Sequence, residues 1–218
     1  MGSMGDPPAN RMPTLVYEQR FWALGYRNLA GLVEAGRGAL AGPVVAAAVV
    51  LSPDKGHEPL LAAGVRDSKQ LTPSRREHLF ELICRQVEGW AVGSVAAGEI
   101  DRLGIVAATR RAMALALQQL PLSPEVLLID YLSLPEQPLP QQPIPHGDQL
   151  SLSIAAASIL AKVTRDRMLI AYDVRYPGYG FARHKGYGTA AHRAALARLG
   201  PCALHRRSFR PLREVLQV

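Results

Sequence analysis

The chain has 218 residues, of which 48% are hydrophobic and 20% are charged. This length and balance are typical of one globular domain with a sizeable core, and they exclude a chain dominated by disorder. The formal net charge of +7 favours a polyanionic partner without identifying it. The longest apolar run, near residues 44–51, is far too short to cross a bilayer, so we expect no membrane partner. The two cysteines, Cys84 and Cys202, are too few for a disulfide framework and fit a cytoplasmic location.

The chain begins with a segment that lacks a strong structural pattern. We interpret residues 1–27 as a flexible lead, with a remnant of cloning at residues 1–4. Hydrophobic patterning then predicts strands over residues 29–34, 44–51, 90–95 and 125–129. The same patterning, with its caps, predicts helices over residues 73–87, 100–120, 151–175 and 190–199. Prolines in residues 132–145 indicate a loop with at most a short strand near Ile144, and residues 176–187 are predicted to be a second loop.

The order of these elements indicates an α/β fold. Two strands form a hairpin and later strands alternate with helices, which favours a sheet of mixed strand direction with helical cover. We therefore expect a core over residues 28–180 and a helical C-terminal extension over residues 181–218 that packs on this core.

Basic residues gather toward the C-terminus. Residues 183–214 contain one acid, Glu214, and the following basic residues: Arg183, Lys185, Arg193, Arg198, Arg206, Arg207, Arg210 and Arg213. A solvated face of a helix and a surface that contacts phosphates both explain this pattern. Charge alone does not decide between them.

Three acids fall at the ends of predicted strands or in a loop before a helix. Glu34 and Asp130 each end a strand, and Asp148 follows Gly147 before the predicted helix 151–175. Carboxylates that converge without Cys or His favour a hard cation, Mg²⁺ or Mn²⁺. Two such ions can activate water and stabilise the leaving oxygen in phosphodiester hydrolysis. The alternative is that these acids are turn and cap residues, with Asp148 capping the helix that follows.

Five segments resemble, in the same order, the motifs of the ribonuclease HII family. They are EAGRGALAGPVVAAA at residues 34–48, DSKQL at 67–71, IAAASILAKVTRD at 154–166, HKGYGT at 184–189 and HRRSF at 205–209. The resemblance extends from about residue 29 to residue 210, which is nearly the whole chain outside the lead.

This resemblance implies a ribonuclease H-like fold, with a five-stranded mixed sheet flanked by helices. It implies an endonuclease that cleaves the RNA strand of RNA–DNA hybrids, or ribonucleotides embedded in duplex DNA, with Mg²⁺ or Mn²⁺, and leaves 3′-OH and 5′-phosphate ends. By the same resemblance, Glu34, Asp130 and Asp148 are catalytic and bind metal. The implied nucleic-acid-binding residues are Gly36, Arg37, Gly38, Lys69, Ser158, Lys162, Arg183, Lys185 and Tyr187. A monomer with a role in ribonucleotide excision repair is expected.

The sequence departs from the family pattern around the expected site. Val33 stands where the family has its first catalytic aspartate, and Tyr131, His146 and Leu150 stand where glycine and two lysines are usual. Three hypotheses follow. The chain is an active nuclease with three carboxylates, an inactive homologue that still binds RNA–DNA junctions, or a scaffold for protein interaction. The intact substrate-reading motifs favour the first two hypotheses.

Overall fold

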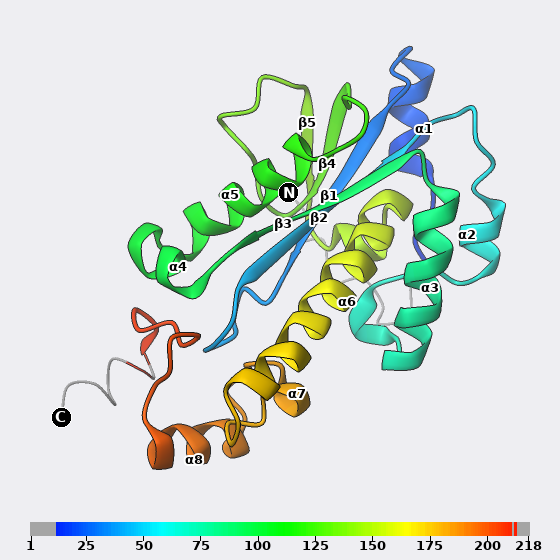
Figure 1. Cartoon of the computed structure of the whole chain (residues 1–218). Helices are drawn as coiled ribbons and strands as arrows, with labels where there is room; N and C mark the ends of the chain where they lie inside the picture. Colours follow the sequence, from blue (N-terminus) through cyan, green and yellow to red (C-terminus); the bar gives the residue numbers. More distant parts are fainter. Residues whose placement is uncertain (1–11, 211, 213–218) are drawn as a thin grey trace, which may run out of the picture.

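A five-stranded mixed sheet forms the centre of the computed structural model, which describes residues 12–210 and residue 212 (Figure 1). The strand order is β3-β2-β1-β4-β5. Strand β2 pairs antiparallel with β1 and β3, whereas β4 pairs parallel with β1 and β5. The strands are β1 Leu29–Ala35, β2 Val44–Leu51, β3 Gly89–Val95, β4 Val126–Asp130 and β5 Gln141–Ile144. The expected fold class is confirmed, and so is the short strand near Ile144.

Helices cover both faces of the sheet. One face carries α4 (Ala97–Leu103) and α5 (Ile105–Gln118), while the long α6 (Leu152–Arg175) crosses the other face beside α3 (Pro73–Gln86) (Figure 1). The remaining helices are α1 Val16–Ala23, α2 Glu58–Ala62, α7 Phe181–His184 and α8 Ala190–Leu199. Single 3-10 turns occupy Ser68–Gln70 and Gly147–Gln149. No helix among the described residues is long and apolar enough to cross a membrane.

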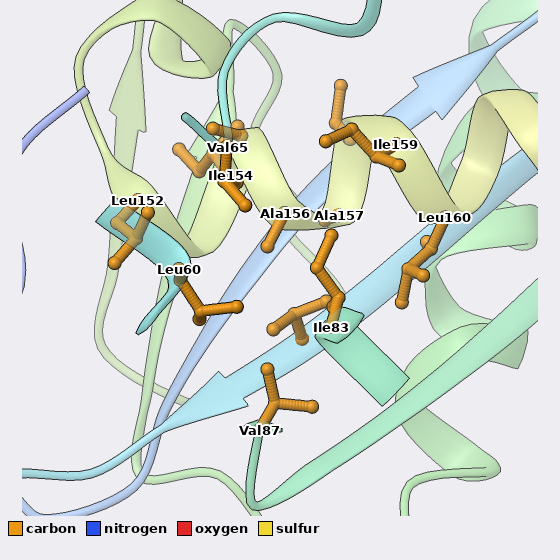
Figure 2. Close-up of a cluster of buried hydrophobic side chains, with 14 of the residues drawn as sticks. Leu60, Val65, Ile83, Val87, Leu152, Ile154, Ala156, Ala157, Ile159 and Leu160 are labelled. Carbon is orange, nitrogen blue, oxygen red and sulfur yellow. The ribbon is translucent and has the colours of Figure 1, made fainter. Parts of the chain in front are cut away.

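The larger core lies between α6 and the sheet. Small residues Ala155, Ala156 and Ala157 let the first turns of α6 approach β1 closely, and Leu60, Ile83 and Val87 close the cluster from α2 and α3 (Figure 2). Each fully buried Leu or Ile contributes about 1.5–3 kcal/mol to folding. This packing fixes α6 against the ends of β1 and β4, so the polar residues farther along the helix are held beside those strand ends.

The expectation of one helix over residues 100–120 is wrong. The structure has two helices, because Gly104 ends α4 and begins α5 with φ of +78°. A positive φ is accessible to glycine without a steric penalty, so this residue allows the chain to turn between the helices. The apolar face of α5 then packs on the sheet through Ala108, Ala112 and Met113.

The expectation of a flexible lead over residues 1–27 is also wrong for its second half. Residues 16–23 form α1, and the side chain of Glu18 is fully buried. Its Oε1 accepts hydrogen bonds from Ser151 Oγ at 2.6 Å, Ser153 Oγ at 2.7 Å and Ser153 N at 3.0 Å. A carboxylate at a helix N-terminus is favoured by the free N–H groups there. Glu18 therefore ties α1 to the start of α6.

Other expectations have mixed outcomes. Helix α6 is capped by Ser151, whose side chain accepts from Ile154 N, so the alternative reading of Asp148 as its cap is wrong. The short helices α2 and α7 were not expected, and α7 lies inside the predicted loop 176–187. The proposed remnant of cloning at residues 1–4 and the end of the extension, residues 213–218, lie outside the described residues. The boundary between core and extension at residue 180 stays a prediction.

Candidate active site

The C-terminal ends of β1 and β4 meet at one cavity of about 570 Å³. Because these two strands are parallel, their carboxyl ends lie at the same edge of the sheet. Glu34, Asp130 and Asp148 all line this cavity, together with Lys69 and Val33. The three acids singled out in the sequence are therefore neighbours in space, although Asp130 and Asp148 lie about a hundred residues after Glu34.

Glu34 enters this cavity from a different side than Asp130. Along β1, Leu29 and Val33 pack in the cluster under α6, whereas Ala30 and Leu32 pack in the cluster under α5. Side chains alternate along a strand, so Glu34 leaves on the α5 side. On β4 the same alternation places Asp130 on the α6 side. Val33 thus faces the same side as Asp130, and it is 4% exposed.

Backbone and lysine contacts hold the two aspartates. Asp130 Oδ1 accepts a hydrogen bond of 2.9 Å from Gly147 N, which connects β4 to the turn that carries Asp148. Asp148 is buried, and its Oδ2 lies 3.3 Å from Lys69 Nζ. The lysine belongs to the turn Ser68–Gln70, where Asp67 accepts from Lys69 N at 2.9 Å. The DSKQL segment therefore positions one cation against one buried acid.

Burial raises the pKa of all three carboxyl groups. The pKa of Asp148 is raised to about 6, first by burial and then by the nearby charges of Asp130 and Asp67. Burial also raises the pKa of Asp130 and of Glu34, and each of these groups further feels another acid of the site. The acids outweigh the effect of burial on Lys69, so the pKa of that lysine is raised as well. The three carboxyl groups are therefore partly buried and electrostatically linked to one another, beside the basic side chain of Lys69.

The donor chemistry of the cavity fits a divalent cation, but only as a partial site. Carboxylate oxygens are the ligands that Mg²⁺ and Mn²⁺ prefer. Among the described residues, however, no three His, Cys, Asp or Glu side chains are grouped closely enough to hold a metal ion. Mg²⁺ is commonly bound by one or two carboxylates, waters and substrate phosphates rather than by a full protein cage. Glu34, Asp130 and Asp148 suit this second mode of binding.

The glycine-containing segment after β1 forms a tight turn on the cavity wall. Ala39 N donates to Gly36 O at 3.2 Å, and Gly36, Arg37 and Gly38 all line the cavity. Arg37 Nη1 lies 3.8 Å from Glu34 Oε1 across the turn. The guanidinium of Arg37 therefore stands beside the acid Glu34 at the wall of the cavity.

The other candidate nucleic-acid-binding residues lie in the same cavity or in one that adjoins it. Ser158, Lys162 and Tyr187 line the first cavity, and a second cavity of about 350 Å³ shares Lys162 and Tyr187 while adding Arg183 and Lys185. All nine predicted residues thus fall along one connected depression. Their role in binding stays a prediction.

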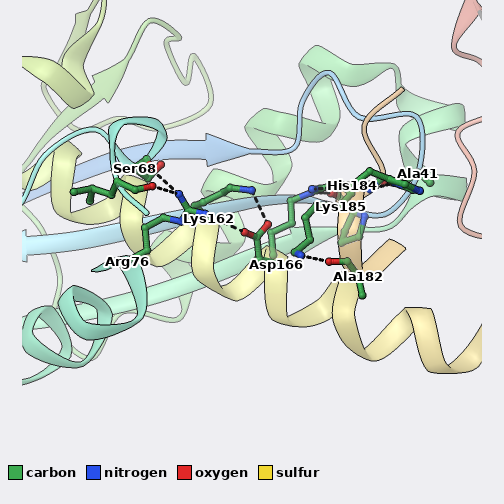
Figure 3. Close-up of polar contacts among 12 residues, drawn as sticks. Ala41, Ser68, Arg76, Lys162, Asp166, Ala182, His184 and Lys185 are labelled. Atoms are coloured by element: carbon green, nitrogen blue, oxygen red, sulfur yellow. Dashed lines mark hydrogen bonds and ion pairs between the residues drawn. The ribbon is translucent and has the colours of Figure 1, made fainter. Parts of the chain in front are cut away.

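Lys162 stands between the two cavities in a small charged network (Figure 3). Its Nζ donates to Asp166 Oδ1 at 2.6 Å and lies 5.8 Å from the centre of the Tyr187 ring. Arg76 from α3 contacts the other oxygen of Asp166 at 3.8 Å and donates to Ser68 O at 3.0 Å. Sequence reasoning missed Arg76 and Asp166. The only sequence signal for them is the position of Asp166 at the end of one motif and of Arg76 shortly after another.

Three non-glycine residues among those described have a positive φ, and each lies next to the site: two are within two residues of Asp130 or Asp148, and the third lines the second cavity. They are Tyr131 at +63°, His146 at +56° and Lys185 at +52°. Tyr131 directly follows Asp130, and Leu132 N donates to Asp130 O at 2.7 Å across it. This is the three-residue turn with a positive central φ, which is rare and strained. Strain held at such positions is typical of functional sites. Tyr131 and His146 are also two of the positions where the sequence departs from the family pattern.

Comparison with known proteins finds relatives over most of the chain. The family model described as "Ribonuclease HII" matches residues 30–211. A protein named ribonuclease HII from Chloroflexus aurantiacus is 55% identical over 205 residues, which cover 94% of this chain and 97% of that protein. Another, from Syntrophotalea carbinolica, is 52% identical and covers 96% of this chain and 98% of its own length.

The fold comparison points the same way. The crystal structure of ribonuclease H2 from Pyrococcus horikoshii superposes with a TM-score of 0.70 at 26% identity, and the match covers 87% of this chain and 97% of that one. The family model and the curated relatives both match most of the sequence, which shows the family of this chain. The chain belongs to the ribonuclease HII family of endoribonucleases, and its function is of the ribonuclease HII type.

Proposed function

We propose that this chain cleaves the phosphodiester backbone of RNA–DNA hybrids, or of duplex DNA with embedded ribonucleotides, in a reaction that depends on Mg²⁺ or Mn²⁺ and leaves 3′-OH and 5′-phosphate ends. The observation that carries the proposal is the cavity at the ends of β1 and β4, which combines three carboxylates with a glycine turn and a tyrosine. An acidic centre beside phosphate-binding groups is the arrangement that such hydrolysis needs.

Glu34, Asp130 and Asp148 are the residues that would hold the cation. A bound divalent ion would lower the pKa of a water molecule and stabilise charge on the phosphate oxygens. Lys69 neutralises part of the charge on Asp148 and keeps that side chain in place. The Gly147 amide orients Asp130 by donating to its Oδ1. Raised pKa values mean that Asp130 and Asp148 hold protons more readily than free carboxylates do, so protons would compete with a cation at this site.

The substrate would be read by the turn and by Tyr187. Tyr187 is 38% exposed, and its ring is backed by Arg165, whose Cζ lies 5.4 Å from the ring centre. An exposed ring held from behind offers a flat surface for a sugar, and the 2′-OH is the group that distinguishes RNA from DNA. Lys162, Lys185 and Arg183 line the adjoining cavity and supply positive charge for flanking phosphates.

A second candidate function is binding of the same junctions without cleavage. The observation that favours it is the position of Val33, whose apolar side chain lines the cavity on the side of Asp130. Valine has no oxygen to offer a cation, so one potential ligand is missing where two strands meet.

The test is a cleavage assay on duplex DNA that contains one ribonucleotide, with Mg²⁺ or Mn²⁺ at increasing concentration. Cut product in the wild type, and its loss in Asp130→Asn, would support the nuclease. Asp54→Asn is a matched control, because Asp54 is an exposed acid that pairs with Arg27 and does not line the cavity, so this change should leave cleavage unchanged. Junction binding without product at any metal concentration would establish the second function instead.

A further inference from the structure

Two buried arginines lie directly behind the glycine turn. Arg165 of α6 and Arg206 of the C-terminal extension are both fully buried. Neither forms an ion pair with an acid of the described residues, and both are surrounded by main-chain carbonyl groups. Arg206 donates to Gly42 O at 3.0 Å, Arg37 O at 2.8 Å and Gly36 O at 2.8 Å. Arg165 donates to Pro43 O at 2.9 Å, Lys185 O at 2.9 Å and Ala41 O at 3.0 Å.

Arg206 determines the direction in which the amides of the turn point. In a trans peptide the C=O and N–H groups point in opposite directions. The carbonyls of Gly36 and Arg37 point inward to Arg206, so the N–H groups of Arg37 and Gly38, which belong to the same peptide units, point away from it. Arg37 and Gly38 line the acidic cavity. Successive N–H groups of this kind form a concave site for an anion such as a phosphate.

Arg165 joins this turn to the loop that carries Tyr187. Its guanidinium donates to the carbonyl of Ala41, three residues after the turn, and to that of Lys185, two residues before Tyr187, and it lies against the Tyr187 ring. Leu40 N and Ala41 N both donate to Gly186 O, at 2.8 Å and 3.2 Å. A Cβ atom added to Gly36 would lie 1.9 Å from Arg165 Nε, so only glycine fits above this guanidinium. The turn and the tyrosine loop are therefore built on one shared support.

The chain keeps two cations at this place although burial disfavours them. Burial, followed by the charge of the neighbouring Arg165, lowers the pKa of Arg206 to about 9. An apolar side chain could fill the same volume without this penalty. Arginine offers what such a residue lacks, a planar set of donors that fixes three carbonyls at once.

We propose that Arg165 and Arg206 are positioning residues for substrate recognition, which lock the Gly36–Arg37–Gly38 turn and Tyr187 into one unit that distinguishes a ribonucleotide junction from plain DNA. The proposal rests on the proposed function, because it assigns the support of the same site. Neither residue contacts the cavity acids, so the effect of replacing them is expected in recognition of the substrate. The basic residues of the C-terminal segment therefore have different roles. Arg206 is buried and supports the site from inside, whereas Arg207 is exposed to solvent.

The test compares Arg206→Lys and Arg165→Lys with the wild type. Lysine keeps the charge but cannot hold three carbonyls in one plane. The dissociation constant is measured in EDTA for a duplex with one ribonucleotide and for the same duplex made of DNA only, over a range of salt concentrations. We expect the preference for the ribonucleotide duplex to fall about 10-fold, equal to ~1.4 kcal/mol, in each variant. The salt dependence should stay unchanged, because the number of charges is the same.

Arg207→Lys is the matched control from the same segment, and it should keep the full preference. Circular dichroism and thermal unfolding check that each variant folds. If Arg206→Lys does not fold, Arg165→Lys alone is used for the test. In addition, free guanidinium should restore the preference for the ribonucleotide duplex in Arg165→Ala. Folded Lys variants that retain the wild-type preference within twofold would overturn the proposal. If the wild type itself shows no preference between the duplexes, the proposed substrate is wrong, which is a separate outcome.

Discussion

Val33 and Asp130 stand side by side at the edge of the sheet. Each directly follows the last pair of the parallel β1–β4 ladder, Leu32 and Ile129, and each faces the α6 side. An acid at position 33 would therefore be the nearest partner of Asp130 for a shared cation. With valine there, Asp130 has Glu34 as its acidic neighbour on β1, and that residue approaches from the other face of the strand.

Replacing Val33 by aspartate should strengthen metal binding and cleavage. We expect the cleavage rate of Val33→Asp at limiting Mn²⁺ to rise at least about 10-fold, since one more carboxylate joins the ligands. The new acid is buried beside Asp130, so the metal-free variant should unfold at a lower temperature and Mn²⁺ should restore it. Val33→Asn, which has the shape of aspartate and adds polarity without charge, is the control. No gain in either metal affinity or rate would mean that position 33 is not the limiting defect.

The buried carboxyl of Asp148 should make metal binding depend on pH. Its pKa is raised to about 6, so protons compete with the cation below that value. We expect Mn²⁺ affinity, measured by calorimetry, to be constant from pH 7 to 8 and to fall by up to about 10-fold per pH unit below 6. An affinity that is the same at pH 5 and pH 7 would contradict a role for this group in binding.

The same shift predicts that Asp148→Asn is more stable than the wild type without metal. A carboxyl with a raised pKa binds its proton more tightly in the folded than in the unfolded state. The free energy of unfolding therefore falls as pH rises from about 4 through 6. Asparagine does not titrate, so its stability does not fall with pH in this way. The free energy of unfolding of Asp148→Asn at pH 7, measured with urea, should exceed that of the wild type by about 1 kcal/mol after allowance for solvent screening. An equal or lower stability would show that the contact with Lys69 outweighs burial.

Two buried histidines should make the C-terminal extension sensitive to acid. His192 Nδ1 donates to Tyr187 O at 2.9 Å, so its Nε2 must accept from His205 Nε2, 3.1 Å away. His205 Nδ1 in turn accepts from Cys202 N at 3.0 Å. Both rings are thus neutral, and a proton on the shared Nε2 of His192 would place two donors face to face. Burial, followed by the charge of His192, lowers the pKa of His205 to about 4.

The expected effect is a loss of stability as pH falls. The unfolded chain binds more protons than the folded chain between about pH 6.5 and pH 4, so the free energy of unfolding decreases across that window. His205→Gln keeps an N–H donor toward His192 but does not titrate. From pH 7 to pH 5, the wild type should lose about 1 kcal/mol more than this variant in urea unfolding. If the wild type and His205→Gln lost the same free energy of unfolding between pH 7 and pH 5, the histidine pair would not be neutral in the folded state.

The strained turn at Tyr131 predicts a difference between two small substitutions. Tyr131 is 68% exposed, so removal of its ring changes little buried area. Tyr131→Gly and Tyr131→Ala both remove the ring, but only glycine adopts φ of +63° without strain. We expect the glycine variant to be more stable than the alanine variant by about 1 kcal/mol in thermal unfolding. An alanine variant of equal or greater stability would show that the turn relaxes.

Much of the fold followed from local pattern. Continuous apolar runs predicted β2 and β4, Thr72 and Pro73 predicted the start of α3, and prolines limited β5 to a short edge strand. The helix break at Gly104 was missed, because one glycine in an apolar helical pattern is usually tolerated. Helix α1 was missed as well, since its main anchor is Glu18, whose partners Ser151 and Ser153 lie more than a hundred residues later.

The sequence by itself determined the family, the order of the elements and the acids at the strand ends. These features can be predicted from local sequence motifs and from the periodicity of hydrophobic residues. Only the tertiary structure decided that Val33 shares the side of Asp130, and that Arg165 and Arg206 bind carbonyls inside the protein rather than phosphates on its surface. The physical reason is that the identity of a residue fixes its charge, but not its partners. Those depend on which distant backbone groups the fold brings within hydrogen-bonding distance.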